Sequence, residues 1–206
     1  MNIIFDFDGT LIDSRLRLFK LFNDLTGQSL LDFDDYWELK RAKRNHKWIL
    51  KKYFNYDEKR FKEFNKRWLE NIETDNYLKF DTIFPYTLLT LDTMKKHGFP
   101  LYLVTARQNK KRLLNQLKNL GLSNFFNFLI VENKKEKAEL IIKKNIPLSE
   151  KDLMVGDTEA DVKIAKKIHI TSIAVLSGFR NRAILKMHSP DYIFSNINEV
   201  LTYVKI

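Results

Sequence analysis

Two aspartates near the start of the chain have the types and spacing of a nucleophile and a proton-transfer group. Asp6 and Asp8 lie two residues apart at the end of the apolar run at residues 2–7. Unpaired carboxylates on a buried run are costly, so a purely structural role explains the pair poorly. One carboxylate can attack phosphorus, and a second can protonate the leaving oxygen and then activate water. In an extended strand, side chains two residues apart share a face.

Further polar residues follow other runs that we predict to be strands. Thr105 ends one of these runs, and Asp157 and Asp161 follow another. A third run is followed by three lysines, which are Lys134, Lys135 and Lys137. Carboxylates in one crevice repel each other unless a cation lies among them, and oxygen-only ligands are typical of Mg²⁺. A divalent ion, a hydroxyl and an ammonium group together favour a phosphoryl group as the ligand.

The runs that end in these residues alternate with helical patterns, which predicts a parallel sheet covered by helices. We expect strands at 2–7, 100–105, 126–131, 152–155, 171–176 and 192–194. We expect helices at 86–97, 109–120, 134–145 and 159–168, and a last one that begins at about residue 197. Such sheets bind ligands at the carboxyl ends of their strands, which is where the polar residues lie.

Residues 14–80 differ from the rest of the chain because they contain no strand-like run. Apolar residues recur there at helical spacing, and the stretches 33–54 and 57–72 are each expected to form an amphipathic helix. We therefore predict a core built from residues 1–13 and 81–206, which is interrupted by a helical insertion.

The net charge of +10 is concentrated in one segment of this insertion. Residues 40–67 hold 12 Lys and Arg against 3 Asp and Glu, together with six aromatic residues. Basic residues interleaved with aromatic ones are typical of nucleic-acid binding, but they also occur as a solvated helical face over an aromatic core. We favour the second interpretation. The alternative is a nucleic-acid-binding protein, or a phosphatase that acts on nucleic-acid ends.

Composition excludes several other classes of protein. The absence of cysteine rules out a disulfide scaffold and a thiolate metal site. Apolar residues make up 44% of the chain, which is enough to form a core and argues against disorder. No apolar run approaches the roughly 20 residues that span a bilayer, and the N-terminus lacks the basic region of a signal peptide. We therefore expect a cytoplasmic protein that does not bind membranes.

Taken in order, DFDGTLIDS, LYLVT, a lysine and VGDTEAD resemble the haloacid dehalogenase-like (HAD) superfamily over the whole chain. The pairing of the first and last motifs is far more specific than either motif alone. The resemblance implies a three-layer, Rossmann-like α/β core with the helical insertion as a C1 cap, as in phosphoglycolate phosphatase-like enzymes. It implies a Mg²⁺-dependent phosphatase that hydrolyses a small phosphorylated metabolite through an aspartyl-phosphate. A sugar-phosphate mutase of the β-phosphoglucomutase type is an alternative that would use the same residues.

The resemblance also implies roles for individual residues around the phosphate. Asp6 is expected to be the nucleophile and Asp8 the general acid and base. The hydroxyl of Thr105 and the backbone N–H groups near Phe7 and Ala106 are expected to hold the phosphate.

The same resemblance implies a set of Mg²⁺ ligands. The ion would be bound by the carboxylates of Asp6 and Asp157 and by the backbone carbonyl of Asp8. Asp161 would be a further ligand, or it would contact the ligands without binding the ion itself.

The chain departs from its relatives at two places. Many relatives have Lys-Pro-x-Pro at the third motif, whereas this chain has lysines without proline. We favour Lys134 as the catalytic and phosphate-binding lysine because it would begin a helix, with Lys137 as the main rival and Lys135 also open. The second departure is Ala106-Arg107, which stands where many relatives have Asn after the threonine, so substrate contacts there are expected to differ.

Overall fold

A parallel six-stranded sheet forms the centre of the computed structural model, which describes residues 1–131, 141 and 146–206. The strands lie in the order β5-β4-β1-β6-β7-β8, and all of their pairings are parallel. Their bounds are β1 (Ile3–Phe5), β4 (Leu101–Thr105), β5 (Phe128–Val131), β6 (Leu153–Gly156), β7 (Thr171–Val175) and β8 (Tyr192–Phe194). The Rossmann-like α/β fold predicted from the sequence is thereby confirmed.

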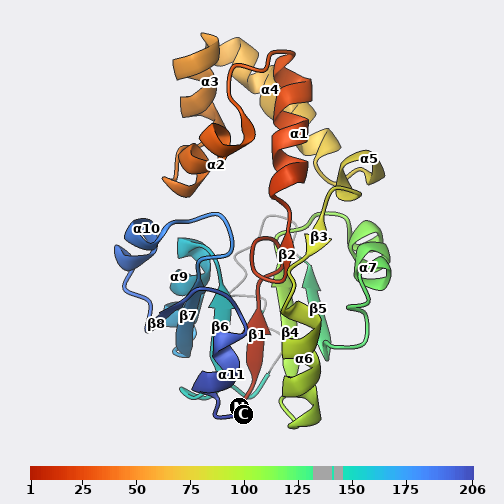
Figure 1. The fold of residues 1–206 in the computed structure, drawn as a ribbon, viewed down its shortest axis with the longest axis vertical. Helices are drawn as coiled ribbons and strands as arrows, with labels where there is room; N and C mark the ends of the chain where they lie inside the picture. The colour runs from red at the N-terminus through yellow and green to blue at the C-terminus, as the bar shows by residue number, and fades with distance from the viewer. Residues whose placement is uncertain (132–140, 142–145) are drawn as a thin grey trace.

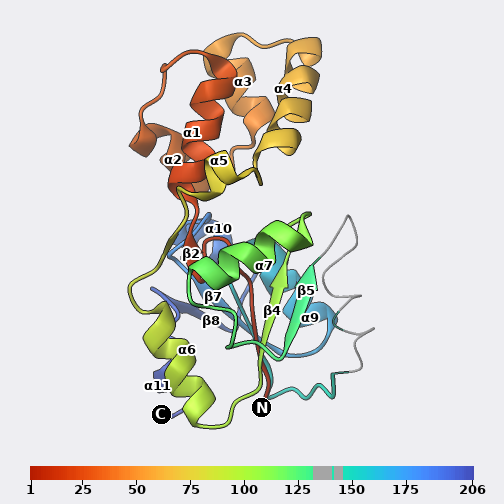
Figure 2. The ribbon, with the colours of Figure 1, turned by 90° about the vertical axis from the view of Figure 1, so that its right-hand side faces the viewer.

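The helices of the core cover both faces of this sheet. They are α6 (Thr87–Lys96), α7 (Lys110–Asn119), α9 (Glu159–Lys167), α10 (Arg182–Lys186) and α11 (Glu199–Tyr203). Figure 2 shows α6 and α11 on one side of the sheet and α9 on the other, which makes three layers. The strands and helices of the core that we predicted begin and end within two residues of the observed bounds. The helix predicted at 134–145 lies outside the described residues, apart from Ile141.

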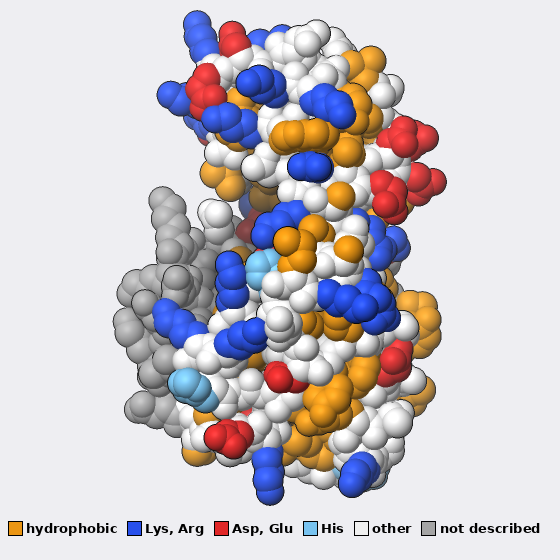
Figure 3. All heavy atoms as spheres, turned by 90° about the vertical axis from the view of Figure 1, so that its left-hand side faces the viewer, with side chains coloured by type: hydrophobic (Ala, Val, Ile, Leu, Met, Phe, Trp, Pro, Cys, Tyr) orange, Lys and Arg blue, Asp and Glu red, His pale blue; other side chains and the backbone are white. Residues whose placement is uncertain are grey.

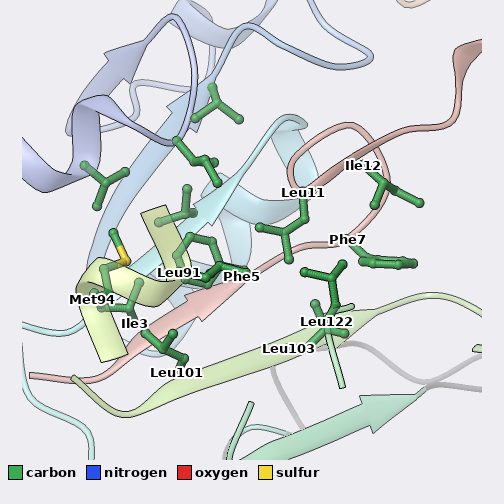
Figure 4. Packing of buried hydrophobic residues seen from close by; sticks show 14 of the residues in the cluster. Ile3, Phe5, Phe7, Leu11, Ile12, Leu91, Met94, Leu101, Leu103 and Leu122 are labelled. Atoms are coloured by element: carbon green, nitrogen blue, oxygen red, sulfur yellow. The ribbon is translucent and has the colours of Figure 1, made fainter. Parts of the chain in front are cut away.

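The central strand β1 is fully buried because helices cover it on both sides. Successive side chains of a strand point to opposite faces, so Ile3 and Phe5 pack into one apolar cluster and Ile4 into another. Figure 4 shows the first cluster, in which Leu91 and Met94 of α6 pack over Phe5. The run of apolar residues at 3–5 is thus explained by burial on both faces.

Five helices form a separate unit above the sheet in Figure 1, and we call them the cap helices. They are α1 (Arg15–Thr26), α2 (Phe33–Arg41), α3 (His46–Phe54), α4 (Glu58–Asn71) and α5 (Asp75–Leu78). The chain leaves and re-enters the core through a two-stranded antiparallel ribbon of β2 (Ile12–Asp13) and β3 (Thr82–Ile83). The predicted limits of the insertion, residues 14 and 80, lie between this ribbon and the cap helices.

The prediction of one continuous helix over residues 33–54 is wrong. The chain breaks between α2 and α3, where Lys43 has a left-handed φ of 63°. The side chain of Asn45 then accepts a hydrogen bond from the backbone N–H of Trp48 at 2.9 Å. Such an N-cap satisfies a backbone donor at the start of α3, so it favours a new helix over continuation of the old one.

Aromatic side chains form the core of the cap helices, and the basic side chains lie outside it. Phe22, Tyr36, Phe54 and Phe64 are buried in one cluster. The other aromatic residues of the basic segment, residues 40–67, pack against that cluster. Figure 3 shows Lys and Arg side chains spread over the outer surface of this unit. Among the described residues, no helix combines the length and the apolarity that a membrane crossing requires.

A partly buried histidine makes the stability of the cap helices depend on pH. The Nε2 atom of His46 lies 2.8 Å from the Tyr36 hydroxyl, and its ring packs against Trp68 at 4.2 Å between centroids. Burial lowers the pKa of His46 well below the ordinary 6.5, and the charge of Lys40 lowers it further. Below about pH 6.5 the unfolded chain therefore binds a proton that the folded chain does not.

We expect the free energy of unfolding to fall as the pH drops from 7 to 5, with a slope of up to about 1.4 kcal/mol per pH unit from this residue. Denaturant titrations across this range measure the slope, and His46→Gln is expected to flatten it. The exposed His97 provides the control, and His97→Gln should keep the wild-type slope. Equal slopes in all three proteins would contradict the prediction.

Candidate active site

Three carboxylates that follow two neighbouring strands meet at the carboxyl edge of the sheet. Asp6 follows β1, whereas Asp157 and Asp161 follow β6, which pairs with β1. One carboxylate oxygen of each residue lies within 4.8 Å of the others, and all three residues are buried. Buried carboxylates this close repel each other strongly unless a cation lies among them. A donor set made only of oxygen atoms fits Mg²⁺.

Glycines lie beside these carboxylates and leave room for them because they have no side chain. A Cβ atom on Gly156 would lie 2.3 Å from the carboxyl carbon of Asp161. A Cβ atom on Gly178 would lie 2.0 Å from Asp157 Oδ2 and 2.6 Å from the carbonyl oxygen of Gly9. Gly9 itself has a left-handed φ of +84°, which L side chains rarely adopt. The backbone therefore approaches the carboxylates more closely than any other residue type would allow.

Hydrogen bonds hold Asp157 and Asp161 in place. Asp157 Oδ2 accepts a hydrogen bond from the backbone N–H of Phe179 at 2.5 Å, and its Oδ1 lies 3.4 Å from the Thr10 hydroxyl. Asp161 Oδ2 accepts hydrogen bonds from the backbone N–H and the hydroxyl of Thr158 at 3.1 and 2.6 Å. Asp161 thus caps α9 with one oxygen and also belongs to the acidic cluster.

The carboxylate of Asp8 has different neighbours from that of Asp6. Its Oδ2 accepts a hydrogen bond from Arg107 Nε at 2.7 Å, and its Oδ1 accepts one from Arg107 Nη2 at 2.8 Å. Oδ1 also accepts a hydrogen bond from Arg17 Nη2 at 2.5 Å. Our expectation of a shared face assumed a strand that reaches Asp8, but β1 ends at Phe5 and the chain turns there.

A buried aspartate completes this ionic cluster. Asp81 lies 2.9 Å from Arg17 Nε and 3.0 Å from Arg107 Nη2, and it also accepts a hydrogen bond from the Gln116 amide at 2.6 Å. Burial raises the pKa of Asp81. Burial alone would also raise the pKa of Asp8, but the charges of Arg107 and Arg17 outweigh it and hold that pKa well below its usual range.

Sequence reasoning did not identify Arg17, Asp81 or Arg107 as site residues. The position of Arg107 could have been recognised from the sequence. It lies two residues after the end of β4, at a place where this chain departs from many of its relatives. Arg17 has no such signal, since a basic residue in the first turns of an amphipathic helix is commonly solvated. Asp81 lies next to the predicted end of the insertion, and only the returning chain brings it beside the two arginines.

The remaining predicted residues lie as follows. Thr105 ends β4 and is buried, two residues beyond Leu103, which pairs with Phe5 of β1. The Thr105 hydroxyl accepts a hydrogen bond from the backbone N–H of Arg107 at 3.3 Å. Phe7 is buried and Ala106 is exposed. The lysine candidates Lys134, Lys135 and Lys137 lie outside the described residues.

The cap helices contact the core on two sides of the site. On one side Glu159 pairs with Lys43 at 2.9 Å and with Arg180 at 2.7 Å, and Arg180 donates a hydrogen bond to the carbonyl of Lys40 at 3.2 Å. Burial would raise the pKa of Glu159, but hydrogen bonds from Arg180 and Lys43 lower it to about 2. On the other side, Glu73 accepts hydrogen bonds from two successive backbone N–H groups after β4, at 2.7 and 2.8 Å.

A family model described as haloacid dehalogenase-like hydrolase matches residues 3–175. The chain belongs to this family. The HAD resemblance predicted from the motifs is therefore confirmed, and the chain is an enzyme of a hydrolase family.

Two curated relatives of this chain are named phosphatases. "Pyrophosphatase PpaX" from Oceanobacillus iheyensis is 27% identical over 217 residues, which cover 98% of this chain and 96% of the relative. "Phosphoglycolate phosphatase" from Escherichia coli K12 is 26% identical over 126 residues, covering 58% of this chain and only half, 50%, of the relative. A solved structure of a HAD-like family hydrolase from Streptococcus pneumoniae matches with a TM-score of 0.79 at 23% identity, covering 98% of this chain and 97% of that one.

We expect Gly178→Ala to weaken Mg²⁺ binding by about 10- to 100-fold, because the new methyl group would displace Asp157. Overpacking of this kind should also lower the free energy of unfolding by about 1–3 kcal/mol. Isothermal titration calorimetry with Mg²⁺ measures the first effect. A Cβ atom on Gly98 would meet nothing within 4 Å, so Gly98→Ala is a control that should keep the wild-type affinity. An unchanged affinity in Gly178→Ala would refute the cation site.

Proposed function

We propose that the protein is a Mg²⁺-dependent phosphatase that hydrolyses a small phosphomonoester through an aspartyl-phosphate on Asp6. The observation that carries this proposal is the buried cluster of Asp6, Asp157 and Asp161 at the carboxyl edge of the sheet. Asp6 follows the central strand β1 and so has a neighbouring strand end on each side. The names of the relatives, a pyrophosphatase and a phosphoglycolate phosphatase, support phosphoryl chemistry.

The residues fit a two-step reaction. In the first step a carboxylate oxygen of Asp6 attacks phosphorus, and the bond from phosphorus to the leaving oxygen breaks. That oxygen takes a proton from the carboxyl group of Asp8. In the second step Asp8 removes a proton from water, the water oxygen displaces the carboxylate of Asp6, and inorganic phosphate leaves.

The protein surroundings support this reaction in three ways. Asp6, Asp157, Asp161 and the backbone carbonyl of Asp8 would hold Mg²⁺, which when bound neutralises carboxylate and phosphoryl oxygens. The Thr105 hydroxyl would orient a phosphoryl oxygen, together with the backbone N–H groups near Phe7 and Ala106. Lys134, which lies outside the described residues, stays our prediction for the lysine that pairs with the phosphate.

A panel of phosphorylated metabolites with Mg²⁺ tests the proposal. The panel contains phosphoglycolate, pyrophosphate, several sugar phosphates and p-nitrophenyl phosphate, and released inorganic phosphate is measured. We expect release from at least one metabolite and loss of that release when EDTA removes the ion. Phosphate that moves to a sugar hydroxyl instead of water would indicate a mutase. No release from any compound would refute the phosphatase proposal.

Asp6→Asn is expected to lower kcat for phosphate release by about three orders of magnitude or more, because an amide cannot form the acyl phosphate. Thermal unfolding should show that the variant folds. The exposed Asp92, which pairs with Lys96 on α6, provides the control, and Asp92→Asn should keep wild-type kcat. Near-normal hydrolysis of p-nitrophenyl phosphate by Asp6→Asn would contradict the mechanism.

A further inference from the structure

We propose that Arg17 and Arg107 form a subsite for a second anionic group of the substrate, a carboxylate or phosphate that is not transferred. The proposal rests on the phosphatase function above and narrows its substrate to phosphoesters that carry another anion close to the phosphoryl group. In this structure the carboxylate of Asp8 occupies that subsite.

The contacts of Asp8 show what the subsite recognises. Arg107 donates to both oxygens of the Asp8 carboxylate, at 2.7 and 2.8 Å, and Arg17 donates to one of them at 2.5 Å. A guanidinium fork that meets two oxygens of one group is the geometry used to bind carboxylates and phosphates. The two arginines thus already hold an anion in the way a ligand would be held.

The role proposed for Asp8 requires it to leave this position. To act on the leaving oxygen, Asp8 must direct a carboxyl oxygen toward the phosphoryl group on Asp6. Both of its oxygens are engaged by the arginines. Asp81 cannot take its place in catalysis, because its side chain is fully buried and bound by both arginines and Gln116.

The movement of Asp8 would leave the two guanidinium groups with Asp81 as their ion-pair partner in the cluster and with the more distant charge of Glu73. The side chains of Arg17 and Arg107 are only 3% and 6% exposed, so water would compensate the excess positive charge poorly. An anion that arrives with the substrate restores the balance. A substrate with a second anion therefore frees Asp8 for catalysis, whereas a substrate without one leaves Asp8 paired with the arginines.

The exposure of the four side chains indicates the side from which an anion would approach. Asp8 is 19% exposed, whereas Asp81 is not exposed at all. Among these four side chains, Asp8 is the most exposed, so we expect an anion to reach the arginines from its side. Arg17 belongs to α1 of the cap and Arg107 to the core loop after β4, so a bound anion would contact both parts of the protein.

Two matched ligands distinguish a binding subsite from an ionic cluster whose only role is to hold the cap against the core. Phosphoglycolate has a carboxylate beside its phosphate, and its methyl ester has the same phosphate and no second charge. Their binding to Asp6→Asn in the presence of Mg²⁺ is measured by calorimetry, and kcat/KM is measured on the wild-type enzyme. We expect a preference for the acid over the ester of about 10- to 100-fold in both measurements.

Variants then test whether the two arginines cause the preference for the acid over the ester. In Asp6→Asn carrying Arg107→Met, or Arg17→Met, the preference should fall to less than about threefold. Arg107→Lys keeps the charge but loses the fork, so it should give an intermediate preference. Arg44 is an exposed arginine of the cap that packs over Trp48, and Arg44→Met is the control that should keep the full preference.

Equal binding of the acid and the ester to Asp6→Asn would overturn the subsite. So would an Arg107→Met variant that weakens both ligands by the same factor, because that is the result expected of a purely structural cluster. If Arg107→Met does not fold, the comparison of acid and ester in Asp6→Asn still decides. A preference in binding without any phosphate release from the wild type would refute the phosphatase function and leave the subsite standing.

Discussion

The mutual repulsion of three buried carboxylates is the constraint on which the site depends. Asp6, Asp157 and Asp161 approach within 4.8 Å because the sheet order places the loops after β1 and β6 side by side. Glycines at 156 and 178 let the backbone come close enough to hold them, and backbone N–H groups fix two of the three. The fold thus holds together carboxylates whose mutual repulsion a bound cation would relieve.

A second group of charged side chains, in which aspartates pair with arginines, links the cap helices to the core. Asp8 and Asp81 face Arg17 and Arg107, and these four residues come from the first loop, the returning ribbon, the first cap helix and the loop after β4. The cluster of three carboxylates and this ionic cluster therefore differ in net charge. One is acidic and fits a cation, whereas the other contains equal numbers of acids and arginines and lies between the two parts of the chain.

Sequence patterns predicted the sheet, the described core helices other than α10 and the three carboxylates, because all of these depend on local periodicity and on residues at strand ends. The break between α2 and α3 was missed, since the cap on α3 by Asn45 outweighs a periodicity that continues across it. The surroundings of Asp8 were missed for another reason. Arg17 is ninety residues from Arg107, and no local pattern predicts that they meet.

The two-stranded ribbon bears on whether the cap of this protein could be exchanged for that of a relative. Insertions such as the cap helices look like modules, because the chain leaves and returns through β2 and β3 at one place. Here the module boundary divides a single ionic cluster: Arg17 and Asp81 lie on the cap side of the ribbon, whereas Asp8 and Arg107 lie on the core side. An exchange of caps between relatives would therefore also change the charge beside Asp8. The cap helices and the charges around Asp8 therefore cannot be exchanged independently.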